Sequence, residues 1–255
     1  MHTISNKELP EVVFGIHAVQ ELLKSDQALQ KVNKVYLQKN LHSGSLTRIN
    51  QRAQALHLVV QAVPKNKLDD LSDHGNHQGV VVTVSPFAYV ELDTLLEQLH
   101  ANQQEPFFLI LDNLNDPRNF GSILRTADAV GVNGVIIPKR RASGVTGLVA
   151  KTATGAIERL PIVRVTNLVQ TIQQLKAAGI WIFGTDMTGT DYRHWNAQGP
   201  IALVIGNEGK GLSTLVKQQV DQMLTIPMIG HVQSLNASVA AGILLYQAFT
   251  SRKVN

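Results

Sequence analysis

The chain has 255 residues, of which 44% are hydrophobic, enough for a sizeable core in one or two domains. It contains no cysteine, which excludes disulfides, iron–sulfur clusters, cysteine nucleophiles and thiolate zinc sites. The net charge of +4 allows a nucleic-acid partner without identifying one, because only 16% of the residues are charged.

Residues 1–86 predict a small α/β domain. Helical periodicity is found at residues 15–25 and 46–56, and apolar runs typical of strands at residues 32–38, 58–63 and 79–86. Residues 87–105 are expected to form a linker that partly docks. Its short amphipathic helix carries the leucines Leu92, Leu95, Leu96 and Leu99.

Residues 106–255 predict a second, larger domain. Strands that are apolar throughout are expected at residues 107–114, 134–138, 161–165, 181–186, 202–207 and 223–228, with helices from about residues 119, 144, 166, 213 and 236. Because such strands are covered by helices on both faces, the expected fold class is α/β with a mostly parallel sheet.

No stretch of the sequence approaches the length of a membrane span, and the first residues lack the basic and apolar regions of a secretion signal. We therefore expect a cytoplasmic protein. One basic run, Lys139 to Arg141, follows an expected strand. It is either a solvated loop tip or part of a nucleic-acid surface, and the charge pattern favours neither.

The first of three polar segments at expected strand ends is LDNLNDPRNFGSILRTADAVG, residues 111–131. Asn119 stands where the N-cap of a helix is expected, and the apolar stripe that follows belongs to the core. Arg125 lies off that stripe and could reach a phosphate or a ribose at the loop mouth. The plainer interpretations are a cap for Asn119 and a surface ion pair with Asp116 or Asp128 for Arg125.

The second segment, IGNEGKGLS at residues 205–213, packs three glycines around Asn207, Glu208 and Lys210. Glycines at this density let backbone amides approach a ligand closely. The segment is not a phosphate-binding P-loop, since Lys210 precedes the last glycine, and it lacks the GxGxxG dinucleotide fingerprint. Glu208 is alternatively a carboxylate that offsets the dipole of the next helix.

The third segment is IPMIGHVQSLNASVAAGILLYQ, residues 226–247. Ser234 and Asn236 precede its helix, and they serve either as caps or as functional groups. The helix has small or apolar residues on nearly every face. We therefore expect it to be buried all round, by insertion into the fold or against a second subunit.

Together, the three segments resemble the signatures of the SpoU (TrmH) family of RNA 2′-O-methyltransferases. The family pattern has an Asn and an Arg six residues apart, a GNE-G-G loop, and a Ser-Leu-Asn before the last helix. Here these are Asn119 and Arg125, residues 206–211, and residues 234–236. The resemblance implies a parallel sheet with a deep trefoil knot, a homodimer, and S-adenosylmethionine (AdoMet) as methyl donor, without a metal.

The resemblance also assigns residues. It implies a donor pocket around Thr185, Gly206, Asn207, Ile226, Met228 and Leu235. Arg125 is implied to activate the ribose 2′-hydroxyl, and the residues implied to orient the arginine, the ribose and the donor are Asn119, Glu208, Ser234 and Asn236. An arginine normally stays protonated, so a role as base requires a neighbouring phosphate or water.

Residues 12–86, with FGIHAVQELL at the start and HQGVVVTV at the end, resemble the L30e-like RNA-binding domain of the family's ribosomal RNA enzymes. This layout favours ribosomal RNA, and the implied target is a guanosine in the peptidyl-transferase P loop region of 23S RNA. Two alternatives stay open: a tRNA ribose 2′-O-methyltransferase of the same family, and an RNA-binding ribosome-assembly factor without catalysis. A nucleotide-binding hydrolase or dehydrogenase is disfavoured because its motifs are absent.

Overall fold

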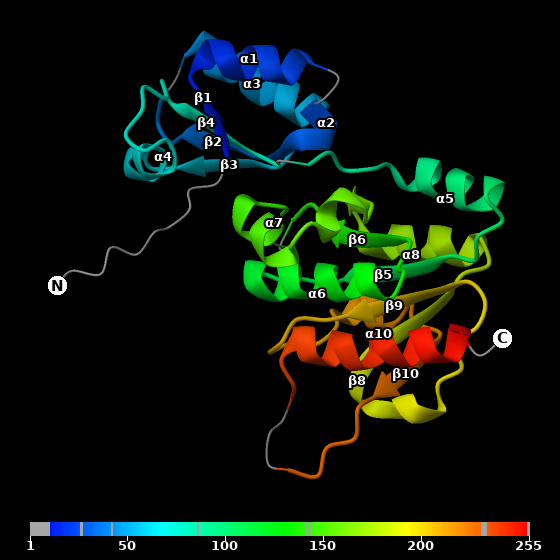
Figure 1. Cartoon of the computed structure of the whole chain (residues 1–255). Helices are drawn as coiled ribbons and strands as arrows, with labels where there is room; N and C mark the ends of the chain where they lie inside the picture. The colour runs from blue at the N-terminus through cyan, green and yellow to red at the C-terminus, as the bar shows by residue number, and fades with distance from the viewer. Residues whose placement is uncertain are drawn as a thin grey trace. The chain divides into compact units, whose positions relative to one another are not determined.

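The computed structural model describes residues 11–25, 28–41, 43–85, 87–140, 142, 144–230 and 234–253. The chain divides into two compact units (Figure 1). The first consists of Met1–Tyr89 and Gly144–Ala150, and the second of Val90–Ser143 and Lys151–Asn255. The division falls within the segment 87–105 that the sequence predicts as a linker. The domain boundaries drawn from the sequence stay predictions.

The first unit is built on a four-stranded sheet in the order β1-β4-β2-β3. Its strands are β1 (Val12–Phe14), β2 (Val32–Gln38), β3 (Val60–Val63) and β4 (Val80–Val84), and its helices are α1 (Ile16–Lys24), α2 (Ala28–Lys31), α3 (Gly44–Ala55) and α4 (Lys65–Leu71). β2 is parallel to β3, whereas β4 is antiparallel to β1 and β2. The two helices and three strands predicted for this unit are present. The sequence did not predict β1, α2 and α4, because they are too short to show a clear hydrophobic periodicity.

Helices cover both faces of this sheet. Buried side chains of α1 and α3, among them Val19 and Ile49, pack with Val80 and Val82. A second cluster on α4 contains Val81 instead, with Val63, Leu68 and Leu71. Because successive side chains of a strand point to opposite faces, the two clusters lie on opposite sides of β4.

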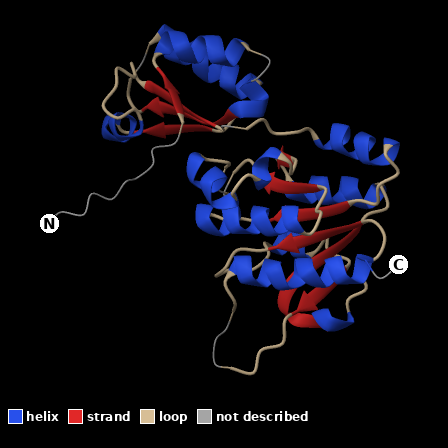
Figure 2. Cartoon of the chain, in the orientation of Figure 1, coloured by secondary structure: helices blue, strands red, loops and turns tan. Residues whose placement is uncertain are grey.

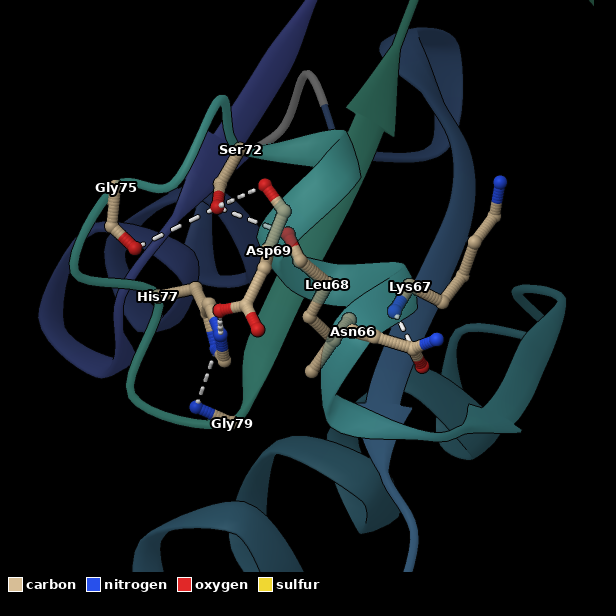
Figure 3. Close-up of polar contacts among 8 residues, drawn as sticks. All are labelled: Asn66, Lys67, Leu68, Asp69, Ser72, Gly75, His77 and Gly79. Atoms are coloured by element: carbon tan, nitrogen blue, oxygen red, sulfur yellow. Dashed lines mark hydrogen bonds and ion pairs between the residues drawn. The ribbon is translucent and has the colours of Figure 1, made fainter.

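A buried polar network closes the loop between α4 and β4 (Figure 3). The backbone N–H of Gly79 donates to Nδ1 of His77 at 3.0 Å. Because a backbone N–H can only donate, Nδ1 accepts, and the ring hydrogen is assigned to Nε2, which lies 3.0 Å from a carboxylate oxygen of Asp69. Ser72 donates its hydroxyl to the carbonyl of Leu68 at 2.8 Å. Both ring nitrogens are therefore satisfied within the first unit.

The second unit is built on a six-stranded sheet in the order β10-β8-β9-β5-β6-β7, in which every pairing is parallel. Its strands are β5 (Phe107–Leu111), β6 (Gly134–Pro138), β7 (Ile162–Val165), β8 (Trp181–Asp191), β9 (Ile201–Ile205) and β10 (Gln222–Thr225). Its helices are α5 (Leu92–Ala101), α6 (Pro117–Ala129), the end of α7 (Gly147–Ala153), α8 (Leu168–Ala177), α9 (Thr214–Lys217) and α10 (Ala237–Lys253), with the turns η1 (Ala156–Glu158) and η2 (Tyr192–His194). The predicted α/β class with a parallel sheet is confirmed, and the knot stays a prediction.

Helices flank the six-stranded sheet on both faces (Figure 2). α5, α8 and α9 share one core with the sheet, to which they contribute Leu95, Ile172 and Val216. α6 and α10 contact each other on the other face (Figure 1). The helix predicted in the linker, α5, is thus part of the core of the second unit.

The start of α6 differs from the expectation. Asp116 is the N-cap, and its carboxylate accepts from the backbone N–H of Arg118 at 2.8 Å. The prediction that Asn119 caps this helix is wrong, since Asn119 lies inside its first turn. Its amide is therefore available for contacts with other segments.

The surface of α10 rules out one of the two ways in which we expect this helix to be buried, insertion into the fold of a single chain. The helix is not buried all round within one chain, because Val239 is 50% and Tyr246 53% exposed. The opposite side of the helix is buried through Ala241, Leu244, Leu245 and Ala248. One chain therefore leaves an apolar stripe of its last helix in contact with solvent.

Candidate active site

A cleft lies at the edge of the six-stranded sheet where β9 and β10 end, beside the middle of β8. Because all strands of a parallel sheet end on one side, the loops that follow them meet there. The cleft has a volume of about 650 Å³, the scale of a small-molecule site. Its lining combines the glycine loop after β9 with apolar side chains that include Ile205, Leu212, Leu224, Ile226, Met228, Leu235 and Leu244.

The glycine loop folds back on itself. The backbone N–H of Asn207 donates to the carbonyl of Gly211 at 3.0 Å, and the N–H of Gly211 donates to the carbonyl of Asn207 at 2.8 Å. The side-chain oxygen of Asn207 accepts from the N–H groups of Gly209 and Lys210. A Cβ at Gly206 would stand 2.3 Å from the carbonyl carbon of Gly211, so this close approach requires glycine.

Asp112 ties the end of β5 to this loop. It is 2% exposed, and its carboxylate accepts from the backbone N–H of Ser213 at 2.7 Å and from the amide of Asn113 at 2.5 Å. The amide of Asn207 donates in turn to the carbonyl of Asn113 at 3.1 Å. Sequence reasoning missed Asp112, although a carboxylate at the end of an apolar strand is a signal that could have found it.

Side chains from three distant segments form one hydrogen-bonded chain at the cleft. The backbone N–H of Ser238 donates to Oδ1 of Asn236 at 2.9 Å, so Nδ2 of Asn236 is a donor, and it reaches Oδ1 of Asn119 at 3.1 Å. Nδ2 of Asn119 donates to Glu208 at 2.6 Å. Each amide orientation follows from the one before it, because the first N–H can only donate.

Glu208 ends this chain on the lining of the cleft. Its carboxylate accepts from Asn119 and, at 3.4 Å, from the amide of Asn207. It is therefore held by α6. A carboxylate has about four lone-pair positions, so Glu208 can accept from a further donor in the cleft.

Arg125 is exposed on α6, and no hydrogen bond or ion pair holds it within the described part of the chain. The surface partners expected for it are engaged elsewhere: Asp128 pairs with Arg159 at 2.6 Å, and Asp116 caps the helix. The interpretation of Arg125 as a surface ion pair is therefore wrong. Arg125 lies on the same i±3 ridge of the helix as Asn119.

The structure gathers most of the residues that the sequence singles out. The lining of the cleft includes all six expected donor residues, Thr185, Gly206, Asn207, Ile226, Met228 and Leu235, together with Glu208 and Ser234. Asn119 and Asn236 are joined to it through hydrogen bonds, and Arg125 is outside the lining. The roles of these residues stay predictions.

An ion pair that the sequence did not reveal lines the same cleft. Lys217 donates to the carboxylate of Asp186, and both side chains line the cleft. The hydrogen bond from Lys217 is the largest cause that holds the pKa of Asp186 below its ordinary value. The pair joins the middle of β8 to α9, two elements whose sequence separation leaves no local pattern.

Comparison with known protein families decides what kind of protein has this site. A family model described as the SpoU rRNA Methylase family matches residues 106–246, more than half of the chain. The chain belongs to the SpoU (TrmH) family. A second model, described as RNA 2′-O ribose methyltransferase substrate binding, matches residues 12–90 of this SpoU chain.

Relatives of the SpoU chain are named as RNA methyltransferases. The Bacillus subtilis protein YacO, named for the TrmH family of tRNA/rRNA methyltransferases, is 48% identical over 243 residues, 95% of this chain and 96% of that protein. The SpoU methyltransferase AviRb from Streptomyces viridochromogenes, solved with AdoMet, has a TM-score of 0.58 at 26% identity and covers 97% of this chain and 94% of its own. An AdoMet-bound rRNA methyltransferase from Sinorhizobium meliloti has the same TM-score and identity, covering 94% and 87%. The SpoU chain is an RNA methyltransferase.

None of the helices in the described ranges is long and apolar enough to cross a membrane. Among the same residues, no group of three or more histidine, aspartate or glutamate side chains is arranged to hold a metal ion.

Proposed function

We propose that this SpoU family enzyme transfers a methyl group from AdoMet to the ribose 2′-hydroxyl of a guanosine in the P loop region of 23S ribosomal RNA. The observation that carries the proposal is the Asn236–Asn119–Glu208 chain, which ends on a carboxylate at the cleft. The match of residues 12–90 to a substrate-binding model named for ribose methyltransferases supports a ribose target. The rRNA enzyme among its structural neighbours supports ribosomal RNA.

The cleft suits AdoMet in its size and in its lining. Apolar walls such as Ile226 and Leu235 fit an adenine ring and an aliphatic chain, and the exposed backbone of the glycine loop fits polar groups. The absence of a Cβ at Gly206 keeps that backbone close to the cleft. When bound, AdoMet supplies a methyl group on a positively charged sulfur. The residues that we assign to it are Thr185, Gly206, Asn207, Ile226, Met228 and Leu235.

Arg125 is assigned to the ribose and its phosphates. Its guanidinium stays protonated, so it stabilises negative charge on the 2′-oxygen, while the hydroxyl proton leaves to a neighbouring phosphate oxygen or water. Asn119 and Glu208 fix the first turn of α6, and thereby the course of the helix that carries Arg125. Ser234 and Asn236 position the loop before α10 on the other side of the ribose.

A homodimer is part of the proposal. The residues Val239, Ile243 and Tyr246 recur at steps of four and three along α10, which makes a stripe on one side of the helix. A second copy packed on this stripe would form a symmetric interface next to Asn236, at the start of the same helix. We place the enzyme in the cytoplasm, where a bacterial ribosomal RNA substrate is made, and keep the knot as a prediction.

The decisive experiment maps ribose methylation in the ribosomal RNA and tRNA of a strain that lacks the enzyme. We expect one 2′-O-methyl mark in 23S RNA to disappear, and the wild-type gene to restore it. A mark lost from tRNA alone would replace the target with tRNA. If no mark changes, and calorimetry of the purified protein shows no AdoMet binding, the chain is an RNA-binding assembly factor and the proposal fails.

A further inference from the structure

We propose that Lys139, Arg140 and Arg164 form a binding site for phosphates of the RNA strand that carries the target ribose. This inference rests on the proposed function, because it names how that substrate is held. The three cations come from neighbouring strands of one sheet: Lys139 and Arg140 follow β6, and Arg164 lies near the end of β7. The third residue of the basic run, Arg141, lies outside the described residues.

The pairing of β6 with β7 brings these cations together. Ile137 stands opposite Arg164 in the parallel ladder, and the backbone N–H of Lys139 donates to the carbonyl of Val165 at 2.7 Å. Val163 and Val165 pack toward the core that contains α5 and α8. Because side chains alternate along a strand, Arg164 points to the opposite face, which is the face of α6.

The electrostatics of the cluster favour an anion. Burial is the largest cause that lowers the pKa of Lys139, and the positive charge of Arg164 lowers it further, while Glu91 acts in the opposite direction. Like charges held together at a half-buried position are costly, and an anion between them offsets that cost.

The place of Lys139 also decides between the two interpretations of the basic run. Arg140 is exposed, as expected of a solvated loop tip. Lys139 is not, because it is half-buried and its backbone N–H is hydrogen-bonded to β7. A lysine that is only a solubilising group has no reason to be held beside a second cation. The structure therefore favours a built surface over a loop tip.

The order of strands places this surface next to the site. β5 lies between β9 and β6, so Asn119, in the helix that follows β5, lies on the side of Glu208 and its cleft that faces the basic cluster. Adjacent strands are about 4.8 Å apart, which puts the ends of β9, before Glu208, and of β7 roughly 14 Å apart. A ribose at Glu208 thus has its neighbouring phosphates within reach of the cluster.

The test compares RNA binding by the full-length wild type, Arg140→Gln and the double variant Arg140→Gln/Arg164→Gln over a range of salt concentrations. The probe is a 23S RNA fragment transcribed without modification, which contains the P loop region. Each cation that neutralises a phosphate steepens the fall of log affinity with log salt by about 0.7 to 0.9. We expect the single variant to lose about one such increment and the double variant about two, with binding about tenfold weaker for the double variant.

Arg159→Gln is the matched control, because it removes an exposed arginine before the opposite end of β7. It should leave the salt slope unchanged. Arg140 is exposed, so the single variant keeps the test valid even if the double variant unfolds. An unchanged slope in both variants, or an equal loss in Arg159→Gln, overturns the phosphate site. A wild type that binds this RNA but methylates none would instead overturn the proposed function and leave the slope comparison intact.

Discussion

The two units of the chain hold their polar side chains in opposite ways. In the first unit His77 is 5% exposed, and Gly79 and Asp69 satisfy both of its ring nitrogens. In the second unit the chain of hydrogen bonds through Asn119 ends on Glu208, whose carboxylate lines a cleft. A closed network, in which every polar group has its partner, fixes a loop. An open network, which ends on spare acceptor positions, can bind a ligand. The first is therefore expected to set stability and the second to set function.

Arg125→Ala should produce the largest effect on activity. Arg125 is the cation that we assign to the ribose and its phosphates, and in the described part of the chain no hydrogen bond joins it to the Asn236–Asn119–Glu208 network. We expect its removal to lower methyl transfer by at least about 100-fold. Donor binding should stay near that of the wild type, since Arg125 does not line the cleft. Methyl transfer is measured in a purified assay with ribosomal RNA, and donor binding by calorimetry with AdoMet. Arg125→Lys is the control, because it keeps the positive charge but loses the paired N–H donors of the guanidinium. Unchanged turnover in Arg125→Ala would refute the assigned role.

Gly206→Ala should be the most damaging change to the donor cleft. The added Cβ would stand 2.3 Å from the backbone of Gly211, so the loop must move, and we expect AdoMet binding to be lost. Gly209→Ala is the matched control in the same loop, because its Cβ would meet its nearest neighbour, the side chain of Asn207, at 3.7 Å. Calorimetry on both variants checks this difference. Equal affinities would show that the close approach at Gly206 does not shape the cleft.

The sequence predicts the second unit better than its site. Buried parallel strands are apolar along their whole length, so β5 and β9 stand out from their surroundings. The hydrogen bond from Asn119 to Glu208 joins residues 89 positions apart, and no local pattern encodes such a pair. The error at the start of α6 had a local signal, since Asp116 followed by a proline is a strong helix start. The sequence could therefore predict which residues form the site, whereas the hydrogen bonds between them could be known only from the folded structure.

Glu208→Ala and Glu208→Gln separate hydrogen bonding from charge in the open network. Alanine leaves the amide of Asn119 without its acceptor, and we expect kcat to fall by about 10- to 100-fold. Glutamine keeps an acceptor at the same place, so we expect its kcat to stay within about tenfold of the wild type. Single-turnover methylation at saturating AdoMet measures both. Equal losses in the two variants would mean that the negative charge, and not the orientation of Asn119, is what the reaction needs.

His77→Ala tests the closed network. The change removes the partner of both Gly79 and Asp69 in a buried loop, and we expect the free energy of local unfolding to fall by about 2 kcal/mol. Hydrogen exchange of the β4 amides reports this loss for the first unit alone. Asn76→Ala, at an exposed position of the same loop, should have little effect. AdoMet affinity should be the same in all three proteins, and a parallel loss of affinity would contradict the separation of roles.

The ion pair of Asp186 with Lys217 should show the smallest effect, and it depends on pH. The folded state holds the pKa of Asp186 below the ordinary value of 3.8, so the pair stabilises the fold above that value and this contribution is lost as pH falls through the lowered pKa. We expect Asp186→Asn to cost less than about 1 kcal/mol near neutral pH, because Lys217 is 49% exposed and water screens the pair. Chemical unfolding of both proteins should give free energies of unfolding that differ at about pH 7 and converge as the pH falls through the lowered pKa of Asp186. A difference in the free energy of unfolding that persists in acid would assign the stabilisation to the backbone hydrogen bonds that Asp186 accepts. This part of the cleft would then resemble the closed network around His77.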